Sequence, residues 1–172
     1  MKAHILNIIP LGLLLSVFAL AAEPTAAIKS APAVVGTWRL VSSESRTETG
    51  EVRPTLGADP VGVLMYDASG HMSVHLMGRN RSTFAAGDMR RGTPEELKAA
   101  FDSYVSYYGT YVIDATEGTI SHHLEGCSFP NWTGTTQKRF LKLEGKRLSL
   151  STPPIRVDGK DVRVFLIWER LN

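Results

Sequence analysis

The chain has 172 residues, a length that suits a single domain. Hydrophobic residues make up 43% of it and charged residues 21%, which is ordinary for a folded globular protein and argues against a disordered chain. With 19 basic and 17 acidic side chains the net charge is only +2, which is too small to indicate nucleic acid as a partner.

Residues 1–21 have the three parts of a secretory signal peptide. Lys2 and His4 form a basic start, Ile5–Leu20 is an apolar run, and Ala19-Leu20-Ala21 fits the small-x-small cleavage rule. A membrane anchor would need about 20 strongly apolar residues, whereas this run is shorter and contains Pro10. We therefore expect a periplasmic or secreted protein with no stable membrane anchor after cleavage.

Residues 22–34 are rich in Ala and Pro and lack periodicity, so we expect a flexible leader before a folded domain over residues 35–172. The single cysteine, Cys127, excludes an internal disulfide. Its expected role is that of a small buried apolar residue, with a reactive thiol or an intermolecular bridge as the alternative.

Short runs with the character of β-strands alternate with turn signals from Val35 onward. In the first run, Trp38, Leu40 and Ser42 are predicted to share one face. Eight such runs are predicted: Gly36–Arg46, Val61–Tyr66, His71–Met77, Tyr108–Asp114, Thr119–Glu125, Thr133–Leu143, Lys146–Thr152 and Val162–Leu171.

One segment departs from the strand pattern and predicts a helix between the third and fourth runs. Thr93 suits an N-cap, and Pro94 suits the first helical position. Apolar residues then recur at spacings of three and four, which predicts one amphipathic helix of about three to four turns; they are Leu97, Ala100, Phe101, Tyr104 and Tyr108.

Eight short strands joined mainly by tight turns predict an all-β, antiparallel meander. Closure into a barrel would remove both exposed edges of the sheet, and eight strands enclose just enough room for one small ligand. A two-sheet sandwich is the alternative that the turn pattern leaves open.

The ends of the predicted domain resemble those of lipocalins. Gly36-Thr37-Trp38 opens the first strand as the lipocalin Gly-x-Trp does, and Arg170 stands where lipocalins place an arginine that packs on that Trp. From about Val35 to Leu171 the chain resembles the bacterial and fungal lipocalin-like domain family, through Asp59-Pro60-Val61-Gly62, Gly70-His71-Met72-Ser73, His122-His123-Leu124-Glu125-Gly126, Phe129-Pro130-Asn131-Trp132-Thr133-Gly134 and Thr152-Pro153-Pro154.

This resemblance implies a calycin-type barrel with an internal pocket. The chain departs from the ordinary secreted lipocalins, whose helix follows the last strand and which carry a disulfide. Related small barrels include carriers as well as cofactor-free cyclases and isomerases, so the resemblance does not assign one activity. Gly36, Trp38 and Arg170 are expected to be structural, with the arginine stacked on the indole.

The fifth run offers two alternative inward faces. Ile120, His122 and Leu124 form the more apolar set, so we expect His122 in or near the lumen, as a hydrogen-bonded core residue, a polar ligand contact or a general base. In the reversed register, His123 and Glu125 would become an interior acid–base couple.

The sixth run places Gln137 and Arg139 on one face with Leu141. An inward arginine could bind a carboxylate through two parallel hydrogen bonds. The alternative is an outward, solvated arginine beside Lys138.

Three further residues are candidate ligand contacts. His75 alternates with apolar neighbours on the third run, so it faces either the pocket or the outside. Trp132 either plugs one end of the barrel or lines its mouth, and Tyr104 either packs or offers its hydroxyl to the pocket. The predicted ligand-binding set is His75, Tyr104, His122, Trp132, Gln137 and Arg139.

No metal or cofactor is expected. His71 and His75 would lie about 13 Å apart along a strand, whereas a metal needs ligands within about 2.1 Å. His122 and His123 point to opposite faces. The sequence also lacks a nucleophile elbow, a phosphate-binding glycine loop and a dinucleotide fingerprint.

Three functions remain open, and the oligomeric state is not indicated. The first is binding of a small hydrophobic or amphipathic molecule, which predicts an internal cavity of roughly a few hundred Å³. The second is a cofactor-free cyclase, isomerase or hydrolase that uses His122 or the His123–Glu125 pair. The third is an envelope interaction protein with a filled barrel.

Overall fold

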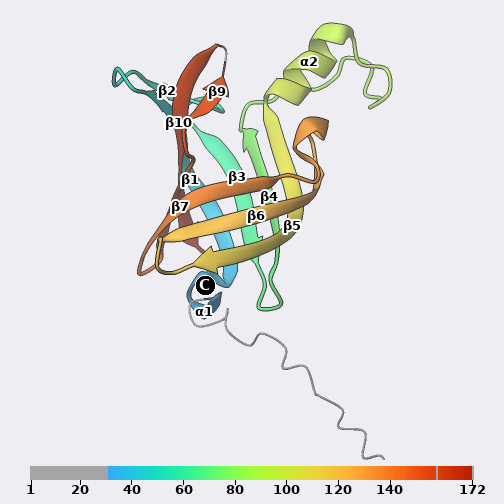
Figure 1. The fold of residues 1–172 in the computed structure, drawn as a ribbon. Coiled ribbons are helices and arrows are strands. Elements are labelled where there is room, and N and C mark those ends of the chain that lie inside the picture. The colour runs from blue at the N-terminus through green and yellow to red at the C-terminus, as the bar shows by residue number, and fades with distance from the viewer. Residues whose placement is uncertain (1–30, 158, 172) are drawn as a thin grey trace, which may run out of the picture.

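The computed structural model describes residues 31–157 and 159–171, which form a closed antiparallel β-barrel (Figure 1). Each barrel strand pairs with its neighbours in chain order, and the last pairs back with the first. The predicted meander barrel is confirmed, and the sandwich alternative is wrong. Its eight strands are β1 (Gly36–Thr47), β3 (Pro60–Tyr66), β4 (His71–Gly78), β5 (Tyr104–Asp114), β6 (Thr119–Cys127), β7 (Thr136–Glu144), β8 (Arg147–Ser151) and β10 (Lys160–Arg170).

Two short strands that the sequence did not predict extend the sheet at one end of the barrel. β2 (Val52–Pro54) pairs with the end of β1, and β9 (Ile155–Val157) pairs with the start of β10. A 3-10 turn, η1 (Pro130–Trp132), connects β6 to β7. The predicted signal peptide and the first part of the predicted leader lie outside the described residues.

The helix α2 (Pro94–Asp102) lies between β4 and β5 as predicted, and it begins at a capping box of Thr93 and Glu96. It is shorter than predicted, because Tyr104 and Tyr108 belong to β5. A spacing of four residues fits a strand as well as a helix, and pairing with β4 decides between them. No residue of α2 is buried, and Figure 1 shows it beyond the end of the barrel wall.

The opposite end of the barrel is closed by α1 (Ala31–Val34), so the fold begins before Val35, within the predicted leader. Val34 is buried, and its carbonyl accepts a hydrogen bond from Trp38 Nε1 at 2.9 Å. The Arg170 guanidinium stacks on Trp38, 4.1 Å from the ring centroid, as the sequence predicted. A Cβ at Gly36 would lie 2.6 Å from Arg170 Nη1, which explains why glycine stands there.

Irregular pairing interrupts two strands, β1 and β6. In β6, Tyr108 of β5 pairs with Gly126 but Gly109 pairs with Leu124, so Glu125 is an extra residue in a β5–β6 bulge. In β1, Leu40 pairs with Trp168 but Ser42 with Ile167, so Val41 is an extra residue. Ser43 is therefore buried, where alternation predicted Ser42.

No helix in the described part of the chain is long and apolar enough to cross a membrane.

Candidate ligand-binding site

The inward face of β6 is the one that the apolar pattern predicted. Ile120, His122 and Leu124 are all at most 2% exposed. His123 and Glu125 are exposed on the outer surface, so the interior His–Glu couple of the reversed register is wrong. His123 Nδ1 instead lies 2.8 Å from the hydroxyl of Thr136.

Two tyrosine hydroxyls from other strands converge on His122. Nε2 lies 2.7 Å from the Tyr66 hydroxyl on β3, and Nδ1 lies 3.4 Å from the Tyr107 hydroxyl on β5. The Tyr111 ring packs against Tyr66 with ring centroids 4.7 Å apart. These residues form a buried polar cluster that the sequence analysis did not predict. Alternation along β3 is the signal that could have found Tyr66, because it lies on the same face as buried Leu64.

Burial determines the protonation of this cluster. It lowers the pKa of His122 to about 3, with further lowering by the positive charge of Arg139 and by His123. Burial also raises the pKa of the Tyr66 hydroxyl. At neutral pH the imidazole is therefore uncharged and the Tyr66 phenol keeps its proton.

Arg139 lies inside the wall, as the inward alternative predicted, and is only 6% exposed. Its Nη1 donates to the carbonyl of Lys138 at 2.9 Å and weakly to Gln137 Oε1 at 3.5 Å. Its Nε is buried without a hydrogen-bond partner. None of the ion pairs among the described residues includes Arg139.

Apolar side chains surround the open end of the barrel, which we call the mouth and define by Leu56, Val105, Cys127 and Trp132. All four are partly exposed and pack against the buried core. Trp132 lies in η1, edge-on to Phe129 at 5.5 Å between ring centroids. The mouth therefore combines apolar surface with solvent access.

A hollow of about 430 Å³ opens beside this mouth. The segment 55–59, the end of β4 and the last turn of α2 form its walls. Leu56 lines the hollow and also packs on the core, so it joins the two regions.

The interior is tightly filled below the mouth. His122 is 1% exposed and Tyr66 is 2% exposed, so side chains occupy the lumen at the level of the polar cluster. The roomy apolar cavity that the binding hypothesis predicted does not exist at this depth. A guest would have to bind above the cluster or displace its side chains.

His75 and Tyr104 are not brought together with the interior residues. They lie on the outer face of β4 and β5, where His75 Nδ1 is 2.7 Å from the Tyr104 hydroxyl. His75 also lines an outer hollow of about 400 Å³ with Ser73 and Tyr108.

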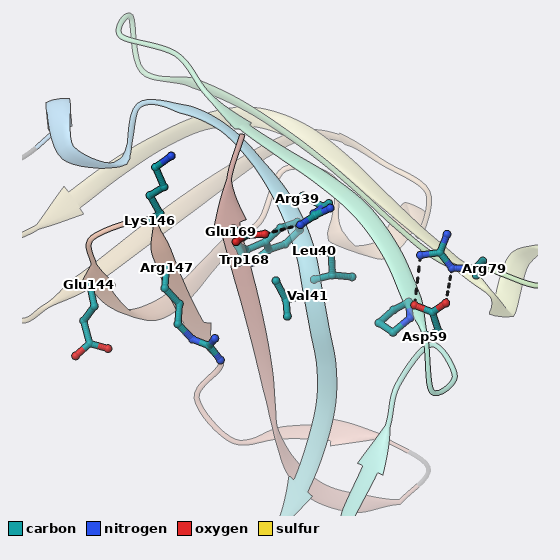
Figure 2. Close-up of a pocket in the computed structure, with 11 residues that line it drawn as sticks. Arg39, Leu40, Val41, Asp59, Arg79, Glu144, Lys146, Arg147, Trp168 and Glu169 are labelled. Atoms are coloured by element: carbon teal, nitrogen blue, oxygen red, sulfur yellow. Dashed lines mark hydrogen bonds and ion pairs between the residues drawn. The ribbon is translucent and has the colours of Figure 1, made fainter. Parts of the chain in front are cut away.

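A second outer hollow, of about 430 Å³, lies over β1, β8 and β10 (Figure 2). Ion pairs Arg39–Glu169 and Arg79–Asp59 cross its rim, as Figure 2 shows. Its charged side chains are exposed, so we regard it as solvated surface. Among the described residues, no group of three or more His, Cys, Asp or Glu side chains could hold a metal ion.

Comparison with known proteins agrees with this architecture. The family model described as a lipocalin-like domain matches residues 35–171. A relative from Aspergillus oryzae, the 4'-hydroxy-3'-methoxypropiophenone carrier protein ppsC, is 35% identical over 107 residues, which cover 58% of this chain and 96% of the relative. The chain therefore belongs to the lipocalin-like domain family.

Proposed function

We propose that this protein binds a small hydrophobic or amphipathic molecule that enters the barrel at the mouth. The observation that carries the proposal is an apolar, partly exposed mouth above a buried polar cluster. Apolar lining with a few convergent polar groups is the usual composition of a small-molecule site.

The relative supports binding rather than a purely structural barrel. Its name describes a carrier of 4'-hydroxy-3'-methoxypropiophenone, a phenol with an aryl ketone. A molecule of this class has an apolar ring for the mouth and polar oxygens for the cluster. We propose that this chain takes an aromatic molecule of similar size and polarity.

Export is part of the same proposal and rests on the pattern of residues 1–21. Intact-mass measurement of the protein recovered from its own host tests it. Loss of about twenty N-terminal residues is expected, and an uncleaved chain in the cytoplasm would contradict it.

Binding can be tested with a neutral apolar fluorophore, N-phenyl-1-naphthylamine, followed by displacement with 4'-hydroxy-3'-methoxypropiophenone. Val105→Trp narrows the mouth, and Val112→Trp is the matched control because Val112 is exposed on the outside of the same strand. We expect at least a tenfold weaker affinity for Val105→Trp and wild-type affinity for Val112→Trp. Failure of the wild-type protein to bind, or equal binding by both variants, would contradict the proposal and favour a surface role.

A second candidate function is proton-transfer catalysis on the bound molecule. The observation that favours it is the convergence of the Tyr66 and Tyr107 hydroxyls on His122. Because the pKa of His122 is lowered to about 3, the imidazole is a weak base. A tyrosine hydroxyl would donate a hydrogen bond to the ligand carbonyl, while a water molecule would take the proton from the adjacent carbon.

Deuterium exchange at the carbon next to the ketone tests this role. Wild-type protein in D₂O is expected to accelerate the exchange of 4'-hydroxy-3'-methoxypropiophenone, and Tyr66→Phe is expected to abolish the acceleration. Exchange at the uncatalysed rate with bound ligand would leave binding as the function and exclude this catalysis.

A further inference from the structure

Arg139 presents a charge that the described residues do not balance. The residue is only 6% exposed, and its buried Nε has no hydrogen-bond partner. Burial of an unpaired charge is strongly unfavourable, so buried arginines are normally paired with an anion. Only neutral oxygens, those of Lys138 and Gln137, accept hydrogen bonds from this guanidinium.

The groups that surround Arg139 supply no negative charge. Tyr66 on β3 keeps its proton because burial raises its pKa, and His122 on β6 is uncharged because its pKa is about 3. Next to these two, Tyr111 packs on Tyr66 and also has a raised pKa, and the Tyr107 hydroxyl lies 3.4 Å from His122 Nδ1. Among the buried residues that the structure describes, Arg139 is therefore the charged side chain at neutral pH.

We propose that the molecule bound by the barrel carries an acidic oxygen and is held as an aromatic oxyanion, phenolate or carboxylate, against the Arg139 guanidinium. This inference rests on the proposed function. It assigns Arg139 as the residue that selects ionised over neutral aromatic guests.

The chemistry of the guanidinium suits this role. Its planar N–H groups donate two parallel hydrogen bonds to a carboxylate, and charge-assisted bonds of this kind are about twice as strong as neutral ones. A phenolate oxygen can accept from the unpartnered Nε, and the Gln137 amide on the same strand face is half-buried beside it. Because side chains fill the lumen at this depth, the guest reaches the guanidinium by displacing side chains of the cluster. Its aromatic ring then points along β7 toward the mouth.

Absorption spectroscopy tests the proposal directly, because a phenolate para to a ketone delocalises its charge and absorbs at longer wavelength than the phenol. The probe is 4'-hydroxy-3'-methoxypropiophenone at a pH where the free phenol is mostly neutral. We expect wild-type protein to produce the phenolate band, with at least tenfold tighter binding of the ionised form. Arg139→Gln is expected to lose the band, while Lys138→Gln, which removes a neighbouring exposed cation, retains it.

Two companion ligands distinguish the sources of the oxyanion. 3,4-Dimethoxybenzoate offers only a carboxylate, and 3',4'-dimethoxypropiophenone cannot ionise. Preference for the benzoate without a phenolate band would identify a carboxylate guest, and the band would identify a phenolate guest. Circular dichroism of Arg139→Gln establishes that the variant is folded, and Arg139→Lys, which keeps the charge, is expected to restore part of the preference.

Binding of the hydroxy ketone in its neutral spectrum, with no preference for benzoate over the dimethoxy ketone, would overturn the inference. If N-phenyl-1-naphthylamine still binds in that case, the proposed function survives and the role of Arg139 alone is wrong. If neither the neutral fluorophore nor any aromatic ligand binds, both proposals fail.

Discussion

The Tyr66 hydroxyl lies 2.7 Å from Nε2 of His122, although 56 positions separate the two residues in the chain. The pair joins β3 to β6 across the interior, and both side chains are buried. This hydrogen bond satisfies a ring nitrogen that has no access to water.

Replacement of Tyr66 by Phe tests how much that hydrogen bond contributes to the free energy of unfolding. Loss of the hydroxyl leaves His122 Nε2 unsatisfied, so we expect the free energy of unfolding to fall by about 1–3 kcal/mol. Urea unfolding measures it. Tyr108→Phe is the control, since Tyr108 is exposed, and it should change stability by less than about 0.5 kcal/mol; equal losses in both variants would contradict the account.

Acid should destabilise the protein through His122. An unfolded histidine titrates near 6.5, whereas the folded pKa of His122 is about 3. Between these values the unfolded chain binds one more proton, so the free energy of unfolding falls as the pH falls, by up to about 1.4 kcal/mol per pH unit. Above pH 6.5 the folded and unfolded states both hold a neutral His122, so its contribution to the free energy of unfolding is fully present.

The comparison of two variants isolates this contribution. In chemical unfolding from pH 7 to pH 4, His122→Gln should show a shallower pH dependence than wild type, because the titrating group is gone. His123→Gln, which replaces an exposed histidine, should keep the wild-type slope. Identical slopes in all three proteins would show that folding does not lower the pKa of His122.

Gly36→Ala should weaken the base of the barrel. Gly36 has φ +139°, and its added methyl group would lie 2.6 Å from Arg170 Nη1, so the guanidinium must leave the face of Trp38. We expect a loss of about 1–3 kcal/mol from backbone strain and a further loss of about 0.5–1 kcal/mol from the cation–π contact.

Gly50→Ala separates the two causes in the same thermal-unfolding experiment. Gly50 has φ +87° but no atom within 4 Å of the added methyl, so only backbone strain acts there. We expect Gly36→Ala to lower the Tm more than Gly50→Ala does.

Two glycines at the β5–β6 bulge should respond differently to substitution. A Cβ at Gly109 would lie 1.9 Å from the backbone oxygen of His123, which cannot move without breaking strand pairing. A Cβ at Gly126 would meet the exposed Tyr108 ring, which can rotate away. We expect Gly109→Ala to prevent accumulation of soluble folded protein and Gly126→Ala to remain folded by circular dichroism; the reverse order would contradict the pairing.

Much of the architecture follows from local patterns in the sequence. Alternation on Ile120, His122 and Leu124 predicted the inward face of β6, and the Gly36–Trp38 motif predicted the stacked Arg170. The inward position of Arg139 was one of two stated alternatives, and burial settles it. These features depend on strand periodicity, which a sequence displays directly.

The remaining features depend on non-local pairing. The extra residue Val41 reverses the alternation of β1, so Ser43 faces inward instead of Ser42. The first residues of β5 were predicted as helix, because a spacing of four residues fits both the helical and the strand period. The Tyr66–His122 contact arises only when the barrel closes, since it joins strands that are not neighbours.

The central claim is that a small aromatic molecule binds inside the barrel at the mouth. The chain has three tryptophans, and each gives one indole N–H signal in a ¹⁵N-labelled protein. Trp132 lies at the mouth, whereas Trp38 lies at the closed base.

The decisive measurement is titration of 4'-hydroxy-3'-methoxypropiophenone into the labelled protein, observed by ¹H–¹⁵N correlation NMR. The account predicts a large, saturable shift of the Trp132 indole signal and an unchanged Trp38 signal. An unchanged Trp132 signal, with shifts confined to amides of an outer hollow such as Ser73–His75, would contradict binding inside the barrel.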